Sequence, residues 1–523
     1  MAVEPILVAG GWRNARAQSA FRAENPATRV MLEGEFPVSG WQDCEDALHA
    51  AAVVARELRT VSAERLADFL NLYAKKIEEN ATALVSKANA ETGLAAVPRL
   101  RDVELPRTTT QLRQGAAAAR EGSWTQAVID TKANIRSHYA PIGPVVVFGP
   151  NNFPFAFNGI SGGDMTAAIA TGNPVIAKAN PLHPGTSKLL AECAVAALAQ
   201  AGLPPATVQM IYRTSKEDGL RLVRDSRIGA VAFTGSREAG LRLKAAAESA
   251  GKPIYLEMSS LNPVILLPGA LAERGEQIAT ELADSCLAAS GQFCTSPNLI
   301  LTIAGDDAER LAANLAAILD QRPPAPLLSA GGLKALDENV HALIDSGAKA
   351  VTGAEPADGG GYCYKNTLLR TTAGQFLAQS EGLQREAFGN STMVVTAEDA
   401  AQLRQVIEAL EGNLTGSIYS STTGEDDAMY AEIAGDLRFK VGRLLNDKMP
   451  TGVALSPAMN HGGPYPSTGH PGFTAVGIPA SLMRFGVLHC YDHVRADRLP
   501  AVLRDKSPNP SMWRRIDGNW TRG

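Results

Sequence analysis

Between residues 174 and 268, short apolar runs alternate with stretches whose apolar positions recur at helical spacing. The runs 174–178, 208–212, 230–234 and 254–258 are predicted strands, and 187–200, 216–225 and 238–249 are predicted helices. Strands and helices that alternate in this way form βαβ units on a parallel sheet. The pattern therefore predicts a nucleotide-binding domain.

The regions on either side follow different patterns. The first 120 residues are predicted to be mostly helical, with alanine-rich faces over 44–58 and 63–91. A second α/β segment is expected from about residue 262 to residue 449. Its glycine-rich stretch at 358–361 favours a surface turn over a phosphate-binding loop.

Composition narrows the class of protein. With 523 residues, 45% of them hydrophobic, the chain can bury a large core and form two domains. A formal net charge of -5 gives no basic surface for nucleic acid, and no apolar run approaches a membrane span. The start of the chain has no signal-peptide pattern. We expect a cytoplasmic protein with a small-molecule partner and neither a nucleic acid nor a membrane partner.

The six cysteines have no regular spacing, which fits reduced thiols and predicts no metal site. Cys294 differs from the others because it lies between small and polar residues in a turn-like segment, 291–296. A buried structural thiol is the alternative. A thiolate there could attack an aldehyde carbon, and the thiohemiacetal could lose hydride to a nicotinamide and leave a thioester.

Two further residues fit that chemistry. Glu257 ends an apolar strand and could be the general base that activates water to hydrolyse a thioester; the alternative is a surface carboxylate. Asn152, in the sequence Asn-Asn-Phe-Pro, could donate its amide to a developing oxyanion, together with the backbone N–H of Cys294. Asn152 could also simply cap a turn.

Together these segments resemble the aldehyde dehydrogenase superfamily from about residue 21 to the C-terminus. The resemblance rests on Asn152–Pro154, Lys178, Phe233–Ser236, Leu256–Met258, Gly291–Thr295 and Glu386–Gly389. Within the superfamily, the motifs at 291–295, 461–466 and 513–518 are similar to the branch of 2,5-dioxovalerate (α-ketoglutarate semialdehyde) dehydrogenases. A related branch that oxidises fatty aldehydes is poorly separated by these motifs.

The resemblance implies an α/β fold in three parts. Residues 1–128 and 143–261 would form a Rossmann-type nucleotide-binding domain, and residues 262–465 an α/β catalytic domain. Residues 129–142 and 482–502 would form a small oligomerisation sheet that joins subunits into a homodimer or homotetramer.

The resemblance also implies an NAD or NADP site. Gly235 and Ser236 match the pyrophosphate turn, although their spacing alone would also suit an ordinary strand-to-helix turn. Lys178 matches the residue that touches the adenosine ribose; alone it could be an exposed strand-end lysine. Glu386 and Phe388 match residues beside the nicotinamide ribose, and alone they would suggest an ordinary turn.

Cofactor choice depends on the position three residues after Lys178. Members that prefer NAD often carry a glutamate there, whereas this chain has Pro181. Without that carboxylate a 2′-phosphate meets no repulsion, so NADP is slightly favoured over NAD. Arg213 could bind the 2′-phosphate or could be a solvated arginine.

Substrate residues are assigned from the resemblance and from charge. Phe153, Phe157 and Ile160 match positions that line the family's substrate tunnel, although they could also be core residues. Arg107 is a candidate cation for an acidic substrate, and a solvated helical face explains it equally well. For His461, a structural role is favoured over substrate contact.

The leading hypothesis is NAD(P)-dependent oxidation of an aldehyde to its carboxylate, with 2,5-dioxopentanoate converted to 2-oxoglutarate. A medium- or long-chain aldehyde dehydrogenase is one alternative. A cysteine hydrolase without a redox cofactor is another, because the same nucleophile could serve it.

Overall fold

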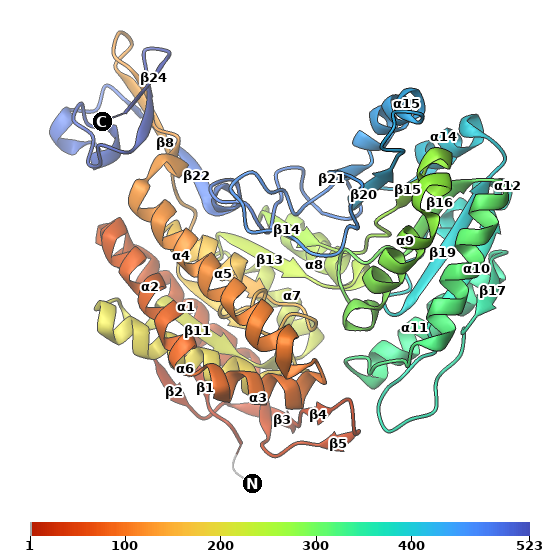
Figure 1. Cartoon of the computed structure of the whole chain (residues 1–523). Coiled ribbons are helices and arrows are strands. Elements are labelled where there is room, and N and C mark those ends of the chain that lie inside the picture. The colour runs from red at the N-terminus through yellow and green to blue at the C-terminus, as the bar shows by residue number, and fades with distance from the viewer. Residues whose placement is uncertain (1–2, 523) are drawn as a thin grey trace.

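The computed structural model describes residues 3–522 and has two α/β lobes with a small sheet that projects from the first lobe (Figure 1). Each lobe is built on a seven-stranded sheet, and the small sheet has five strands. A further two-stranded sheet lies in the N-terminal region, and a three-stranded sheet joins two N-terminal strands to a strand at 213–214. Within residues 3–522, no helix is long and apolar enough to cross a membrane.

The first lobe has five parallel strands in the spatial order β14-β13-β9-β10-β11. In chain order this is 5-4-1-2-3, the Rossmann arrangement, with its switch point between β9 and β13. The parallel strands are β9 (Val145–Phe148), β10 (Val175–Lys178), β11 (Val208–Ile211), β13 (Ala230–Thr234) and β14 (Ile254–Glu257). The antiparallel strands β1 (Ile6–Val8) and β2 (Gly11–Arg13) extend the sheet beyond β11.

The α-helices of this lobe flank the sheet. They are α1 (Trp41–Glu57), α2 (Ala63–Glu79), α3 (Ala81–Thr92), α4 (Leu105–Glu121), α5 (Gly163–Ala170), α6 (Pro184–Ala201), α7 (Lys216–Arg224) and α8 (Arg237–Ser249). A π-helical segment, η2 (Ala96–Glu104), leads into α4. Helix α6 begins one turn before the predicted start, because Pro184 suits the first helical turn.

The expectation of a mostly helical N-terminal region is wrong for residues before Trp41. That stretch contains β1 and β2, then β3 (Ala17–Phe21), β4 (Glu24–Asn25), β5 (Val30–Met31) and β6 (Phe36–Ser39). The strands are short and several are exposed, so they lack the long apolar alternation by which strands are recognised. β12 (Arg213–Thr214) pairs with β6.

The second lobe has a sheet of order β17-β18-β19-β16-β15-β20-β21, parallel except for β17. Its strands are β15 (Val264–Leu266), β16 (Leu299–Ile303), β17 (Lys349–Thr352), β18 (Thr367–Thr372), β19 (Ser391–Ala397), β20 (Asn413–Tyr419) and β21 (Val441–Asn446). Its helices are α9 (Pro268–Leu287), α10 (Asp306–Gln321), α11 (Ala330–Asp345), α12 (Ala373–Ala378), α13 (Ser380–Leu383), α14 (Ala400–Ala409) and α15 (Asp427–Arg438). Two separate apolar cores, one on each face of the sheet, hold these helices in place.

The small sheet has the order β22-β8-β7-β23-β24. Its strands are β7 (Val128–Asp130), β8 (Ile135–Pro141), β22 (Gly486–Asp492), β23 (Trp513–Ile516) and β24 (Asn519–Arg522). The two segments expected to share a small sheet do so, and β22 pairs with β8 over its whole length. Strands β23 and β24 of the C-terminal tail were not expected in it.

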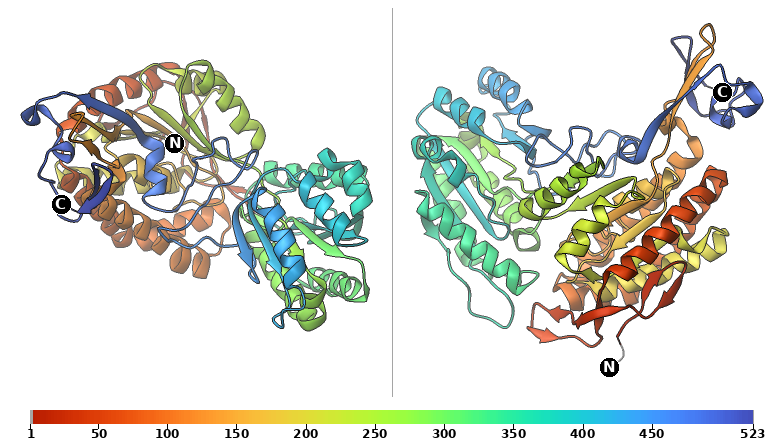
Figure 2. Two further views of the ribbon diagram at one scale, coloured as in Figure 1. Left: turned by 90° about the horizontal axis from the view of Figure 1, so that it is seen from above. Right: turned by 180° about the vertical axis from the view of Figure 1, so that it is seen from behind.

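A long segment without strands, 447–485, connects β21 of the second lobe to β22. Figures 1 and 2 show this blue segment crossing from the second lobe to the first, past the ends of β13 and β14. Glu257 and Thr468 form an isolated antiparallel bridge there, and the Met258 N–H donates to the Ser467 carbonyl at 2.8 Å. The segment therefore lies against the carboxyl end of β14.

Candidate active site

The loop that carries Cys294 follows α9 and a short 3-10 turn, η5 (Ala288–Gly291). Ala289, Ser290 and Gly291 all have positive φ angles. At Gly291 a Cβ atom would overlap the Gly389 carbonyl, so glycine permits both this φ and the close approach of the 386–389 turn. This contact brings the loop of Cys294 against the turn of Glu386.

Asn262 fixes the other side of the same loop. Its Nδ2 donates to the backbone carbonyls of Cys294 and Ser296, each at 2.9 Å. Its Oδ1 accepts from the hydroxyls of Ser260 and Thr415, also at 2.9 Å. All four capacities of this buried amide are used, so the backbone of Cys294 is held firmly.

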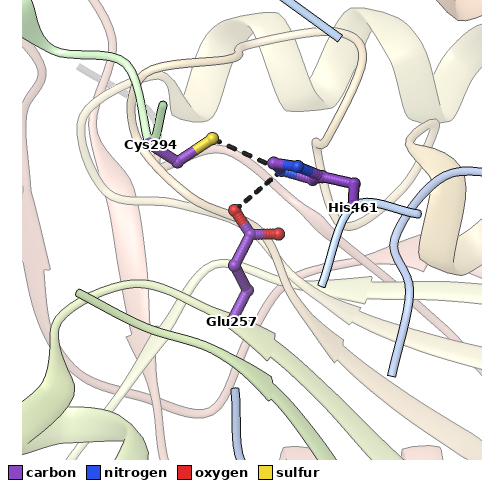
Figure 3. A group of neighbouring side chains, drawn as sticks. All are labelled: Glu257, Cys294 and His461. Atoms are coloured by element: carbon purple, nitrogen blue, oxygen red, sulfur yellow. Dashed lines mark hydrogen bonds and ion pairs between the residues drawn. The ribbon is translucent and has the colours of Figure 1, made fainter. Parts of the chain in front are cut away.

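Three side chains converge at the centre of the site, as Figure 3 shows. His461 Nε2 lies 3.4 Å from Cys294 Sγ and 3.1 Å from Glu257 Oε1. Glu257 and His461 are buried, and the Cys294 side chain is half-buried. A structural role for His461 was favoured from the sequence, whereas the structure places its ring between the predicted nucleophile and the predicted base.

Burial and the neighbouring Glu257 carboxylate raise the pKa of the Cys294 thiol well above its ordinary value. A thiolate at this position is therefore unfavourable unless a base takes its proton. His461 Nε2 is close enough to be that base, and a resulting imidazolium could donate to Glu257.

The turn of Asn152 follows β9 and is held by a buried ion pair. Glu104 Oε1 accepts from the N–H groups of Phe155 at 2.8 Å and Ala156 at 3.0 Å, and Glu104 Oε2 pairs with Arg99 at 2.6 Å. Arg99 in turn donates to the Asn152 carbonyl at 3.1 Å. The Asn152 amide donates to the Gln292 carbonyl at 2.8 Å, which leaves its second N–H for another acceptor.

Cys294 lines two cavities. The first, about 310 Å³, lies at the switch point between β9 and β13, where ligands of doubly wound sheets bind. It is bounded by the predicted residues Asn152, Gly235, Ser236, Glu257, Glu386 and Phe388. Burial raises the pKa of the Glu386 carboxyl to about 7.

The second cavity, about 160 Å³, shares Cys294, Phe153 and Phe157 with the first and is mostly apolar. Phe153 and Phe157 line it as predicted, together with Phe293, Val453 and His461. Ile160 is different: it is fully buried in the core of the first lobe and is not among the residues that line either cavity.

Arg107 points its guanidinium toward the second cavity. One Nη donates to the Val453 carbonyl, and the Phe157 ring lies 5.6 Å from the guanidinium carbon. Within residues 3–522, its buried Nε and second Nη have no hydrogen-bond partner. Burial lowers the pKa of Arg107, and among the described residues the guanidinium forms no ion pair, although Glu104 interacts with it electrostatically.

A third cavity of about 630 Å³ opens beside β10 and contains Lys178 and Arg213. Lys216 and Arg242, which were not predicted, add two more cations. Burial and the charge of Arg213 lower the pKa of Lys178 to about 8. Pro181 follows β10 but is not among the residues that line the cavity.

Four residues of the site were not found from the sequence. Arg99 and Glu104 hold the turn of Asn152, and Asn262 holds the loop of Cys294. Arg443 donates to the carbonyls of Pro450 at 2.7 Å and Gly452 at 3.1 Å. The next residue, Val453, is the one whose carbonyl accepts from Arg107. No local pattern marks them.

Comparisons with known proteins show which family the chain belongs to. A model of the aldehyde dehydrogenase family matches residues 12–455. Alpha-ketoglutaric semialdehyde dehydrogenase 2 of Azospirillum brasilense is 35% identical over 96% of this chain and 97% of its own length. Alpha-ketoglutaric semialdehyde dehydrogenase of Acinetobacter baylyi is 34% identical over 90% of each chain.

A solved structure shows the same fold. PnpE from Pseudomonas sp. WBC-3, in complex with nicotinamide adenine dinucleotide, superposes with a TM-score of 0.80 at 20% identity, over 96% of this chain and 100% of that chain. The chain therefore belongs to the aldehyde dehydrogenase family. The superfamily, the α/β fold class and the enzyme class expected from the sequence are confirmed.

Proposed function

We propose that this aldehyde dehydrogenase oxidises 2,5-dioxopentanoate to 2-oxoglutarate with NADP or NAD. The observation that carries the proposal is the position of Cys294 between two cavities, with the incompletely bonded guanidinium of Arg107 beside the smaller one. The names of the two relatives that match nearly the whole chain support the same substrate.

The first step is attack of the Cys294 sulfur on the aldehyde carbon. His461 Nε2 takes the thiol proton, and the imidazolium then lies between the Cys294 thiolate and the Glu257 carboxylate. The free N–H of Asn152 and the backbone N–H of Cys294 stabilise the oxyanion of the thiohemiacetal. The two N–H donors therefore stabilise the negative charge of the oxyanion, which is absent from the aldehyde and develops in the transition state.

The second half of the reaction needs a hydride acceptor and a water molecule. A nicotinamide cofactor, when bound, accepts the hydride that the thiohemiacetal carbon loses. Glu257 then removes a proton from the water that hydrolyses the Cys294 thioester. The unpartnered Oε2 of Glu257 is a free acceptor for that water. Release of the carboxylate regenerates the thiol.

The residues of the first cavity fit a nicotinamide dinucleotide. Ser236 caps α8 by accepting from the Ala239 N–H, and the remaining N–H groups of the first turn would bind a pyrophosphate. Glu386, which lines the same cavity, would accept from ribose hydroxyls. Use of NADP is supported by Pro181, which leaves the adenosine side without a repelling carboxylate. The cations Lys178, Arg213, Lys216 and Arg242 support it too.

The second cavity favours a short acid aldehyde. Arg107 can bind a carboxylate through its Nε and free Nη, while the phenylalanine rings exclude water from the reacting carbon. The cavity volume of about 160 Å³ suits a five-carbon chain better than a long alkyl chain. A fatty-aldehyde dehydrogenase and a cysteine hydrolase are the alternatives to be tested.

The three-part division expected from the sequence remains part of this proposal. The first lobe, with 1–128 and 143–261, would bind cofactor, and 262–465 would carry the nucleophile. The small sheet of 129–142 and 482–502, joined by the tail strands, would pair subunits into a homodimer or homotetramer.

Steady-state kinetics over an aldehyde panel with NADP and NAD tests the proposal. We expect the highest kcat/KM with 2,5-dioxopentanoate, and NADP used at least as well as NAD. Arg107→Met should raise KM for the acid aldehyde by about 10- to 100-fold, the equivalent of one charged hydrogen-bonded contact, and leave pentanal nearly unchanged. The matched control is Arg113→Met, on the same helix, where the arginine pairs with exposed Glu78.

Three outcomes would contradict the proposal. A higher kcat/KM for neutral long-chain aldehydes would favour the fatty-aldehyde alternative. Failure of every aldehyde in the panel to form reduced cofactor, together with turnover of esters or amides, would favour the hydrolase. Equal effects of Arg107→Met on acid and neutral aldehydes would remove Arg107 from carboxylate recognition.

A further inference from the structure

The three side chains at the centre of the site are also of the types that bind metal ions. Cys294 Sγ, His461 Nε2 and a Glu257 carboxylate oxygen all lie within 4.8 Å of one another. A thiolate, an imidazole and a carboxylate are the three ligand types that bind zinc in proteins. Three such protein ligands with a water in the fourth position form the usual open zinc site.

The distances suit a tetrahedral ion. Zinc bonds of about 2.3 Å to sulfur and about 2.0–2.2 Å to nitrogen and oxygen place tetrahedral ligand atoms about 3.4–3.6 Å apart. The observed separations are 3.4 Å between Sγ and Nε2 and 3.1 Å between Nε2 and Oε1. Small rotations of the Cys294 and Glu257 side chains would therefore complete the polyhedron.

A second observation points to a ligand here. Glu257 is 2% exposed, yet its Oε2 has no hydrogen-bond partner within residues 3–522. A buried carboxylate oxygen without a donor is unfavourable. Oε1 is the oxygen that faces His461, so the carboxylate would have to turn, or bind through both oxygens, for the same cation to satisfy Oε2. Cys294 lines both cavities, Glu257 lines the first and His461 lines the second, so the three side chains lie where the two cavities share the thiol.

We propose that Cys294, His461 and Glu257 form a zinc site that reversibly blocks the nucleophile. Zinc binding replaces the thiol proton, which passes to solvent, and the Zn–S bond forms with no change of oxidation state. The thiolate and carboxylate together neutralise the charge of Zn²⁺. The thiolate selects zinc over magnesium or calcium, which prefer oxygen ligands.

Nearby cations limit the strength of this site. Arg107 and Arg443 both interact electrostatically with Cys294 and oppose a second positive centre. A carboxylate-bearing substrate that engages Arg107 competes for the same space. The zinc form is thus a resting state of the enzyme without substrate, in which the thiol is shielded from alkylation and oxidation.

Cobalt(II) is the probe, because a thiolate-to-cobalt charge-transfer band reports a sulfur ligand directly. Purified enzyme without aldehyde or cofactor should bind one cobalt per chain with this band, and zinc should displace it. Zinc should also slow alkylation of Cys294 by iodoacetamide, and a chelator should restore the rate. Neither readout depends on the substrate assignment or on turnover.

Variants separate the proposed ligands from the rest of the chain. His461→Asn and Glu257→Gln should each weaken binding by at least about 100-fold, since even outer-shell partners are worth about 10- to 100-fold. Cys294→Ser should abolish the charge-transfer band. The matched control is His341→Asn, which removes an exposed imidazole beside Asp337 and should change nothing.

Circular dichroism establishes that each variant is folded before metal is added. Two conservative ligand variants are used so that failure of one to fold still leaves a test. Absence of the charge-transfer band in the wild-type enzyme overturns the proposal. So does equal metal affinity in the wild type and in a folded His461→Asn or Glu257→Gln variant.

Discussion

At the scale of single residues, activation of Cys294 depends on whether His461 Nε2 carries a proton. His461 Nε2 faces both Cys294 Sγ and Glu257 Oε1, and one ring nitrogen can carry only one proton. When Nε2 is unprotonated it accepts from the thiol; when protonated it donates to the carboxylate. Movement of that proton therefore couples activation of the nucleophile to the state of the base.

The Glu257 carboxylate should have opposite effects on the two chemical steps. Its charge raises the pKa of the Cys294 thiol, so Glu257→Gln should lower that pKa and move the pH profile of Cys294 alkylation to lower pH. Thioester hydrolysis loses its base, so steady-state turnover should fall by about 10²- to 10⁴-fold while a burst of reduced cofactor remains. Rapid-mixing absorbance and iodoacetamide kinetics measure both effects.

Two controls accompany that variant. Glu248→Gln, at an exposed ion pair on α8, should behave as the wild type. Cys294→Ala should give neither burst nor turnover while still binding cofactor. Unchanged steady-state turnover in Glu257→Gln would exclude this carboxylate from hydrolysis.

His461 should control the pH dependence of the first step. Without its imidazole the thiol, whose pKa is raised by burial and Glu257, loses the nitrogen base that faces its sulfur. In His461→Asn the burst rate at neutral pH should fall by about 10²-fold or more. It should then rise about tenfold per pH unit, because the thiolate fraction does so below the thiol pKa.

Burst rates measured across pH in the wild type, His461→Asn and the surface control His341→Asn check this expectation. A burst rate in His461→Asn with the wild-type pH profile would assign His461 a purely structural role. That role was favoured from the sequence because a lone histidine before two glycines gives no indication of its neighbours.

At the scale of elements, the sequence predicted correctly where the strands of the first lobe end. It did not predict which side chains contact residues far away in the chain. Lys178, Thr234 and Glu257 end short apolar runs, and a parallel sheet brings such ends to one edge. Arg99 and Glu104, in contrast, act on a turn about fifty residues later in the chain. Nothing in the local pattern of 96–104 reveals that contact.

The buried Glu104–Arg99 pair should govern the geometry of the Asn152 turn. Glu104→Gln keeps an acceptor for the Phe155 and Ala156 N–H groups but places an amide against the Arg99 guanidinium. We expect the free energy of unfolding to fall by about 3 kcal/mol, as when one partner of a buried pair is removed. We also expect kcat to fall about tenfold or more as the Asn152 amide shifts.

Denaturant titration and a double-mutant cycle with Asn152→Ala measure the two effects. If Glu104 acts through Asn152, the losses in kcat should not add. Glu64→Gln, at an exposed bridge to Arg120, should cost less than about 1 kcal/mol. Fully additive losses in kcat would mean that Glu104 stabilises the fold without positioning the amide.

At the scale of the whole molecule, the site is assembled from segments far apart in the chain. Glu257 and Asn152 come from the first lobe, Cys294 from the second, and His461 from the segment that crosses back between them (Figures 1 and 3). Periodicity could predict the two sheets separately. It could not predict this crossing segment, because 447–485 contains no strand or α-helix that a pattern could reveal, only one short 3-10 helix, η6 (Ala480–Phe485).

The projecting sheet should hold subunits together. Strand β22 is an edge strand, and its Leu488 is 57% exposed. Other strands and positions of the same sheet carry further exposed apolar residues: Val128, Ile135, Val487, Trp513 and Trp520. An edge with unpaired backbone groups and apolar side chains is suited to a second copy of the chain.

We expect Leu488→Lys to lower the mass measured by light scattering from a dimer or tetramer toward smaller species. Val351→Lys is the matched control, because Val351 is also exposed on an edge strand, β17, of the second lobe. Its mass should equal that of the wild type. A monomeric wild-type enzyme at micromolar concentration, or an unchanged mass for Leu488→Lys, would show that this sheet does not join subunits.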